Sequence, residues 1–224
     1  ELCQLDKVYL HNLTNYNKIL VQRNNLLKQI SFNSNLLDTL SIWDKQLVKY
    51  GISLIERRSK FIKQLNEIVY GIHKKLSGGN ESLILKYEPN VTVEDFENRL
   101  LSVREKELRT QVTSIGPHRD DMDFLIGDID LRKFGSQGQQ RTCALSVKLA
   151  EIELVKKVIN NKPVLLLDDV LSELDSKRQN YLLESIDGIQ TILTCTGLDE
   201  FVNSRIEFNK VYHIVKGTAK KIVS

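Results

Sequence analysis

One long apolar stripe constrains the fold of this chain more than any other sequence feature. From Leu36 to Leu76, apolar residues recur at steps of three and four with one gap at Arg58, and no proline interrupts them before Gly78-Gly79. This spacing is typical of one face of an α-helix. A helix over residues 36–77 would be about 63 Å long at 1.5 Å per residue. We therefore expect it to project from a smaller domain.

Two further helices are predicted in the first half. Residues 8–30 form one candidate, joined to the long helix by a turn at Asn33-Ser34-Asn35. Residues 92–112 form the other, with Thr92 as N-cap and Asp95 completing an approximate capping box. An ordinary helical bundle is the alternative, but the length of the middle helix favours an antiparallel arm.

The second half changes to strands alternating with helices. We expect strands at 82–87, 122–126 and 129–131, the last two joined at Gly127-Asp128, then a helix at 137–159. A buried strand at 163–167, a helix at 176–186 and strands at 190–194 and 211–215 follow. The order predicts an α/β fold, a parallel-rich sheet with right-handed crossovers, beside the helical arm. The predicted division is 1–112, mainly arm with a strand at 82–87 belonging to the sheet domain, and 113–224.

Composition excludes several classes of protein. Hydrophobic residues make up 41% and charged residues 27%, which is ordinary for a globular chain. No apolar run reaches the roughly 18 residues of a membrane span, and the N-terminus carries no signal-peptide pattern. The three cysteines form no C-x-x-C pair, which disfavours a zinc site or disulfide framework and indicates a reducing, cytoplasmic setting. The net charge of +3 does not by itself indicate nucleic-acid binding.

A glycine-rich segment opens the predicted helix at 137. It reads F-G-S-Q-G-Q-Q-R from Phe134 to Arg141. Glycine allows close approach of a ligand, serine offers a hydroxyl, and the free N–H groups of a helix start attract anions. The segment could hold a terminal phosphate; the alternative is a serine N-cap with a flexible entry.

A second segment places two carboxylates after a buried strand. Pro163-Val164-Leu165-Leu166-Leu167 leads into Asp168 and Asp169, and ligands of open α/β sheets bind at such carboxyl ends. One carboxylate could hold Mg²⁺ and the other could orient or deprotonate a water. Two acids capping the next helix are the alternative.

Together these segments resemble the second half of an ABC-type ATPase head, with a signature loop, a Walker B strand and a D-loop. The resemblance implies that Asp168 is the magnesium-associated aspartate and that Asp169 is the catalytic base, where the superfamily usually has glutamate. It implies that Ser172 and Asp175 belong to the D-loop. It also implies contacts to the γ-phosphate of ATP bound on the opposite subunit by residues of the signature loop: Ser136, Gln137, Gly138 and Gln139.

A narrower resemblance is to the RecF family of bacterial recombinational repair ATPases. It rests on Q-R-N-N-L-L-K at 22–28, G-P-H-R-D-D at 116–121, F-G-S-Q-G-Q-Q-R-T at 134–142 and L-D-D-V-L-S-E-L-D at 167–175, and it covers essentially the whole chain. The family resemblance implies ATP and Mg²⁺ as cofactors and an ATP-dependent homodimer that grips DNA. It also implies partnership with RecR, recognition of junctions between single- and double-stranded DNA at gaps, RecA loading, and a place in the SOS response.

Two departures from the family pattern matter. The 224 residues contain no G-x-x-x-x-G-K-[ST] phosphate loop, which the family carries upstream, so the chain resembles a member without its N-terminal part and we expect it to be inactive alone. Cys195-Thr196 stands where many ABC ATPases have a switch histidine. A thiol cannot replace an imidazole as partner of the γ-phosphate, although Thr194 or Thr196 could do so weakly, and this predicts slow hydrolysis.

Other readings remain open at this stage. A chromosome-maintenance ATPase head, a transporter subunit and a non-catalytic interaction fragment are the alternatives. A basic strip on the middle helix, at Arg57, Lys60 and Lys63, is a candidate DNA contact. His118 is either a packed, hydrogen-bonded residue or a functional one. Arg119 is expected to form an ion pair that holds its loop near the signature loop, and Cys143 to be buried.

Overall fold

The computed structural model describes residues 1–159, 161–171, 174–196 and 209–223. They form two compact units, Glu1–Asn161 and Lys162–Ser224. Each unit is described by itself.

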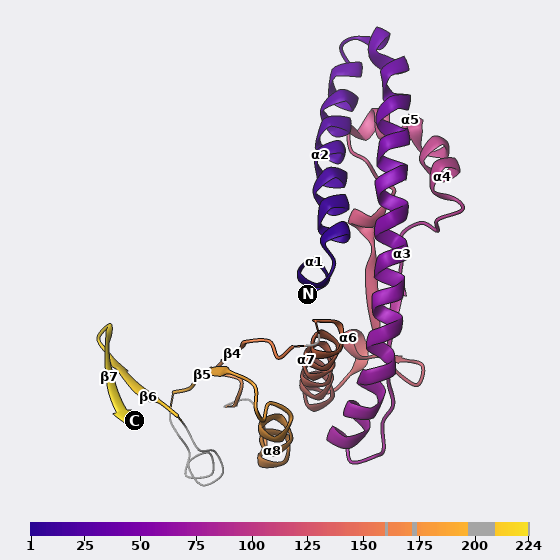
Figure 1. Cartoon of the computed structure of the whole chain (residues 1–224). Helices are drawn as coiled ribbons and strands as arrows, with labels where there is room; N and C mark the ends of the chain where they lie inside the picture. Colours follow the sequence, from indigo (N-terminus) through magenta and orange to yellow (C-terminus); the bar gives the residue numbers. More distant parts are fainter. Residues whose placement is uncertain (160, 172–173, 197–208, 224) are drawn as a thin grey trace. The chain divides into compact units, whose positions relative to one another are not determined.

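The first unit begins with a helical hairpin. Helices α1 (Leu2–Leu5) and α2 (Lys7–Ile30) precede the short 3₁₀ helix η1 (Ser34–Leu36) and the forty-residue α3 (Leu37–Leu76). Asp6 caps α2, because its carboxylate accepts the N–H groups of Val8 and Tyr9, each at 2.9 Å. Helices α2 and α3 run antiparallel (Figure 1), so the predicted arm is confirmed.

Only part of α3 belongs to the hairpin. A first core packs α2, the first half of α3 and α4 together around Tyr16, Leu47, Leu54 and Phe96. A second core packs the later half of α3 against β1 and α7 around Leu65, Val69, Leu83, Leu85 and Ala150. The same helix therefore carries the arm and supports the sheet.

The prediction of a single helix over residues 92–112 is wrong. The segment is divided into α4 (Phe96–Ser102) and α5 (Arg104–Thr110) at Val103, whose ψ of 1° departs from helical geometry. The expected Thr92–Asp95 pair does form, with Asp95 N donating to Thr92 Oγ1 at 3.2 Å. It lies in the turn before α4.

Three strands form an antiparallel sheet in this unit. They are β1 (Leu83–Glu88), β2 (Asp121–Ile126) and β3 (Ile129–Asp130), in the order β1-β2-β3. The turn at Gly127, with φ 58°, joins β2 and β3 as the sequence predicts. The chain then enters α6 (Leu131–Phe134), where the sequence suggested the end of a strand, and α7 (Gln137–Ile159), whose bounds match the prediction.

The second unit contains the predicted parallel pair. Strand β4 (Leu165–Asp168) pairs in parallel with β5 (Thr191–Thr194), and α8 (Ser176–Ser185) lies between them in the sequence. The predicted final strand, β6 (Val211–Val215), forms an antiparallel pair with β7 (Thr218–Val223) and does not join the parallel strands. Strand β7 was not anticipated, because Lys220 and Lys221 interrupt its apolar pattern.

The contacts divide the chain at a different point from the boundary predicted at 112/113. Helix α7 packs on α3, and the first compact unit therefore extends to Asn161. The assignment of 113–224 to an ATPase head stays a prediction. Among the helices that the structure describes, none is long and apolar enough to cross a membrane.

Candidate functional site

The signature-like segment forms a complete capping box at the start of α7. The Ser136 hydroxyl accepts the N–H of Gln139 at 3.2 Å, and the Gln139 side-chain oxygen accepts the N–H of Ser136 at 3.0 Å. On its other side, Gln139 Nε2 donates to Glu81 Oε1 at 2.8 Å. The serine N-cap, which the sequence offered as the alternative to a phosphate site, is therefore present, and such a cap is compatible with ligand binding.

Several donors remain for a ligand at this helix start. Ser136 uses its oxygen as an acceptor within the box, which leaves the hydroxyl proton as a donor. Gln137 and Gly138 occupy the first helical positions, where N–H groups have no intrahelical acceptor. Ser136 and Gly138 are both exposed. The arrangement can present an O–H and two N–H groups to one anion.

The two glycines of the segment have different roles. A Cβ on Gly135 would come within 2.6 Å of the Leu131 carbonyl oxygen, so the backbone there leaves no room for a side chain. A Cβ on Gly138 would meet only Ser136 Oγ, at 4.0 Å. The fold requires Gly135, whereas the space beside Gly138 is open.

The paired carboxylates stand where β4 ends. Asp168 is opposite Thr194 in the parallel register, and the Thr194 hydroxyl donates to Asp168 Oδ1. The N–H of Asp169 lies 3.1 Å from the Thr194 carbonyl oxygen and 3.2 Å from its hydroxyl. Thr194 thus ties both residues to β5. The sequence suggested the Thr194 hydroxyl as a weak phosphate partner, but its proton is already donated to Asp168.

Asp169 has an uncommon backbone conformation. Its φ of 51° lies in the left-handed region, which non-glycine residues enter at a cost of about 1–2 kcal/mol. Both carboxylates are exposed. The strand end therefore holds two exposed aspartates in different backbone conformations.

Asp168 fits a magnesium ion held mainly by phosphates and water. Among the described residues, no group of three or more His, Cys, Asp or Glu side chains could hold a metal. Mg²⁺ commonly takes one or two protein carboxylates and keeps several waters. One exposed carboxylate at this position is consistent with that mode.

The D-loop prediction is covered only in part. Asp175 caps α8, because its carboxylate accepts the N–H of Arg178 at 3.0 Å and pairs with the Arg178 guanidinium at 2.6 Å. Ser172 lies outside the described residues. The signature segment belongs to the first unit and the Asp168–Asp169 pair to the second, and each is placed only within its own unit.

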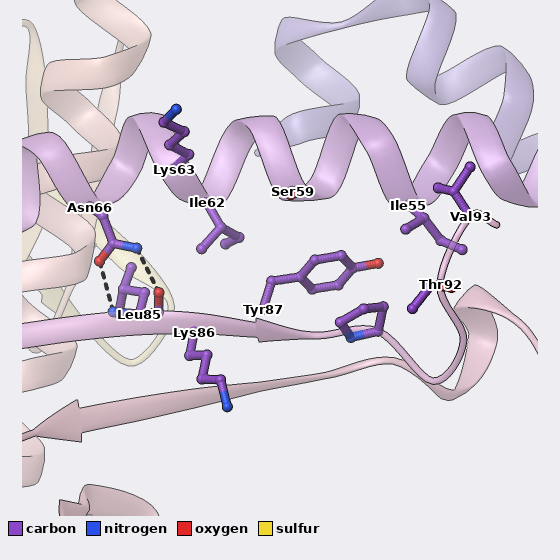
Figure 2. A pocket seen from close by; sticks show the side chains of 11 residues that line it. Ile55, Ser59, Ile62, Lys63, Asn66, Leu85, Lys86, Tyr87, Thr92 and Val93 are labelled. Atoms are coloured by element: carbon purple, nitrogen blue, oxygen red, sulfur yellow. Dashed lines mark hydrogen bonds between the residues drawn. The ribbon is translucent and has the colours of Figure 1, made fainter. Parts of the chain in front are cut away.

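The three candidate DNA-contacting residues differ in their surroundings. Arg57 forms an ion pair with Asp6. Lys60 and Lys63 are exposed, and no ion pair involves either within the part of the chain that the structure describes. Lys63 also borders a cavity of about 450 Å³ between α3 and β1, where the Asn66 amide pairs with the backbone of Leu85 (Figure 2).

Comparison with known proteins decides the family. No family model matches the chain. It is 62% identical over 221 residues to a DNA replication and repair protein RecF from Lachnoclostridium phytofermentans and 60% identical over 222 residues to one from Agathobacter rectalis. Each alignment covers 99% of this chain and 61% of the relative. The chain belongs to the RecF family.

Solved structures agree with this assignment. A structure of the recombination mediator protein RecF with ATP, in the RecFOR pathway, shares 36% sequence identity and a TM-score of 0.87. The comparison covers 98% of this chain and 60% of that one. The fold is thus the α/β fold and arm of RecF, and the chain spans about 61% of the length of its curated RecF relatives. The family assignment decides against the chromosome-maintenance and transporter alternatives.

The G-P-H-R-D segment that suggested RecF contains a short 3₁₀ helix, η2 (Pro117–Arg119). His118 Nδ1 lies 2.7 Å from the Tyr16 hydroxyl and Nε2 lies 3.1 Å from the Thr113 carbonyl oxygen. A carbonyl can only accept, so Nε2 carries the proton and Nδ1 accepts from Tyr16 in the neutral ring. Burial lowers the pKa of His118, which favours that neutral form. The structural alternative for His118 is the one that these contacts support.

The prediction that Arg119 forms an ion pair is wrong. Arg119 is exposed, and no ion pair involves it among the residues with described positions. Arg58 of α3 takes that role, donating to Asp120 Oδ2 at 2.7 Å and to the Pro117 carbonyl oxygen at 2.6 Å. Cys143, in contrast, is buried as expected.

Proposed function

We propose that this chain supplies the signature loop and the Walker B strand of an ATP-dependent, DNA-binding protein of recombinational repair. The observation that carries the proposal is the pair Asp168–Asp169, fixed by Thr194 at the end of a parallel strand. The RecF relatives and the RecF structure with ATP support it. Because these proteins are longer than the chain, the proposal concerns the chain as part of a RecF-length protein.

The two aspartates would divide the work of hydrolysis. Asp168 would hold Mg²⁺, which when bound neutralises phosphate charge. Asp169 would accept the proton of the attacking water. The hydrogen bonds from Asp169 N to the carbonyl oxygen and hydroxyl of Thr194 attach the backbone of Asp169 to β5. Cys195, which is exposed directly after β5, offers no imidazole to the γ-phosphate, and we therefore expect slow turnover.

The signature loop would act on the nucleotide of a second subunit. The donors that it could offer to a phosphate are the Ser136 hydroxyl and the N–H groups of Gln137 and Gly138. Gly138 leaves open space beside them. A γ-phosphate brought by another subunit would satisfy these donors, so that ATP binding favours a homodimer.

DNA and the recombination proteins complete the proposal. The dimer would grip duplex DNA near gap junctions, act with RecR and support RecA loading in the cytoplasm. Lys60 and Lys63 are the better candidates for phosphate contacts on α3, because Arg57 is already paired with Asp6. Phosphate contacts of this kind lose affinity steeply as salt rises.

The first test separates binding from chemistry. In the full-length protein, Asp169→Asn keeps the shape of the side chain but removes the proton acceptor. Turnover should fall about 10²–10⁴-fold, while ATP binding and ATP-dependent dimerisation persist. Steady-state phosphate release and sedimentation with a non-hydrolysable ATP analogue would measure the two. Unchanged turnover would remove Asp169 from the mechanism.

The second test addresses the signature loop. Ser136→Arg should leave ATP binding to the monomer intact and block dimerisation, because a bulky cation replaces a small hydroxyl in a close contact. Lys148→Arg on α7 is a matched control, since it adds bulk on the same helix away from the loop. Normal dimerisation of Ser136→Arg, or lost monomer affinity for ATP, would place the loop in cis.

A further inference from the structure

The Gln139 side chain is held in one orientation by two different partners. Its oxygen accepts the Ser136 N–H, and its nitrogen donates to Glu81 Oε1. If the amide were reversed, a donor would face the Ser136 N–H and an oxygen would face the Glu81 carboxylate. Both contacts would then be repulsive. Glu81 therefore selects the orientation of Gln139 that closes the capping box.

Glu81 also lies close to the end of α3. Its second carboxylate oxygen, Oε2, lies 3.5 Å from Nε2 of the fully buried His73, in the last turn of that helix. On the other side of the ring, His73 Nδ1 lies 2.9 Å from the Ser146 hydroxyl, which donates to the Thr142 carbonyl oxygen at 2.7 Å. Since that hydroxyl proton is used, Nδ1 donates to Ser146, so only the doubly protonated ring can also attract the Glu81 carboxylate through Nε2. The contacts run from the buried end of α3, through Glu81, to the start of α7.

We propose that Glu81 is a positioning residue of the signature loop, which fixes Gln139 and, through it, the Ser136 cap. The inference rests on the proposed function, because it assumes that the loop binds the phosphate of a second subunit. With Gln139 held, Ser136 keeps its backbone N–H engaged and its hydroxyl proton available. Without Glu81, the amide of Gln139 can reverse or leave, and the loop loses the geometry in which its donors converge.

An exchange of side chains tests the pair directly. Gln139→Glu places a carboxylate against the Glu81 carboxylate at a position where the two partners are now 2.8 Å apart. This repulsion should open the cap. Adding Glu81→Gln to Gln139→Glu rebuilds the contact with donor and acceptor exchanged, because the new amide at 81 donates to the new carboxylate at 139, which still accepts the Ser136 N–H.

Two readouts should be taken on the full-length protein. Amide hydrogen exchange at Ser136 reports the cap whether or not the loop binds nucleotide, and sedimentation with a non-hydrolysable ATP analogue reports dimerisation. Gln139→Glu should raise exchange and weaken dimerisation, each about tenfold, as for one lost charge-assisted hydrogen bond. The double variant should return both readouts to within about twofold of the parent. Glu153→Gln, which removes a carboxylate elsewhere on α7, should change neither.

The outcomes distinguish this proposal from the one on which it rests. If exchange at Ser136 ignores Gln139→Glu, or if the double variant is no better than the single one, Glu81 does not position the loop. If Ser136→Arg blocks dimerisation while Gln139→Glu leaves it normal, the positioning proposal fails and the proposed function stands. If Ser136→Arg dimerises normally, the assignment of the loop to a second subunit fails first.

Discussion

Arg23 and Glu107 form an ion pair of 2.7 Å in which both side chains are fully buried. The same guanidinium donates to Asp44 Oδ1 at 2.7 Å and to the Thr113 hydroxyl at 2.7 Å. Arg104 pairs with the second oxygen of Asp44 at 2.6 Å. Two cations and two carboxylates thus balance one another where α2, α3 and α5 meet.

Removing the central cation should be costly. Arg23→Met leaves the fully buried carboxylate of Glu107 without its cation and removes one of the two cations of Asp44, and it should lower the free energy of unfolding by about 3–5 kcal/mol. Arg104→Met is the matched control: its side chain is 30% exposed and contacts only Asp44 within this network, so it should cost about 1 kcal/mol or less. Urea unfolding measures both. An equal decrease in the free energy of unfolding for both variants would show that the buried Arg23–Glu107 pair contributes no more than the exposed contact of Arg104.

Two glycines of α3 should respond to alanine with opposite signs. A Cβ on Gly51 would lie 2.3 Å from Cε1 of the buried Phe96 ring, and overpacking of this kind costs about 1–3 kcal/mol. In the part of the chain that the structure describes, no atom lies within 4 Å of the corresponding position at Gly71, so alanine there should stabilise the helix by about 0.5–1 kcal/mol. Thermal unfolding of Gly51→Ala and Gly71→Ala would show it. If both variants changed the unfolding temperature in the same direction, the difference in packing between Gly51 and Gly71 would be contradicted.

The half-buried imidazole of His118 should make stability depend on pH. Its pKa is lower in the folded protein because burial disfavours the charged ring, so the unfolded chain binds the proton more readily. Its contribution to stability is therefore present above the unfolded value of about 6.5 and is lost as the pH falls below it.

The test compares unfolding at pH 7.5 and at pH 5.5. His118→Gln should show a smaller decrease in stability between these values than the parent. His11→Gln, which changes an exposed histidine of α2, should retain the parental decrease. An identical pH dependence in all three proteins would exclude His118 as the source.

The cysteines should react with alkylating agents in a defined order. Burial raises the pKa of Cys143 to about 11, so little thiolate exists at pH 8, whereas Cys195 is exposed. Iodoacetamide should therefore label Cys195 first, as read by peptide mass spectrometry. In denaturant the two should react at similar rates. Equal labelling of the folded protein would show that the α7 helix opens readily.

The sequence predicts the long helices of this fold better than it predicts the contacts between elements. The bounds of α3 follow from apolar periodicity, because that helix has buried residues from Leu40 to Leu76. The bounds of α7 also match the prediction, although its buried residues extend only from Thr142 to Leu154. The break at Val103 carries no such signal, since neither glycine nor proline marks it. Its position depends on how α4 and α5 meet the rest of the unit.

The candidate site shows the same limit. Sequence segments make Ser136 and the Asp168–Asp169 pair candidates, because each stands at the boundary of a helix or strand. They could not identify Glu81 as the partner of Gln139, 58 residues away. They also assigned an ion pair to Arg119 that Arg58 makes instead, 62 residues from Asp120. Ion partners across such separations are set by the fold and leave no local pattern.

The open space beside Gly138 has a genetic consequence. Because a methyl group there touches no atom of the described residues closer than 4.0 Å, cells with Gly138→Ala should accumulate normal amounts of the protein. The substitution at Gly135, where the methyl group meets backbone, should lower its abundance. A repair defect in the first strain would then report a lost molecular contact, and a defect in the second a shortage of protein.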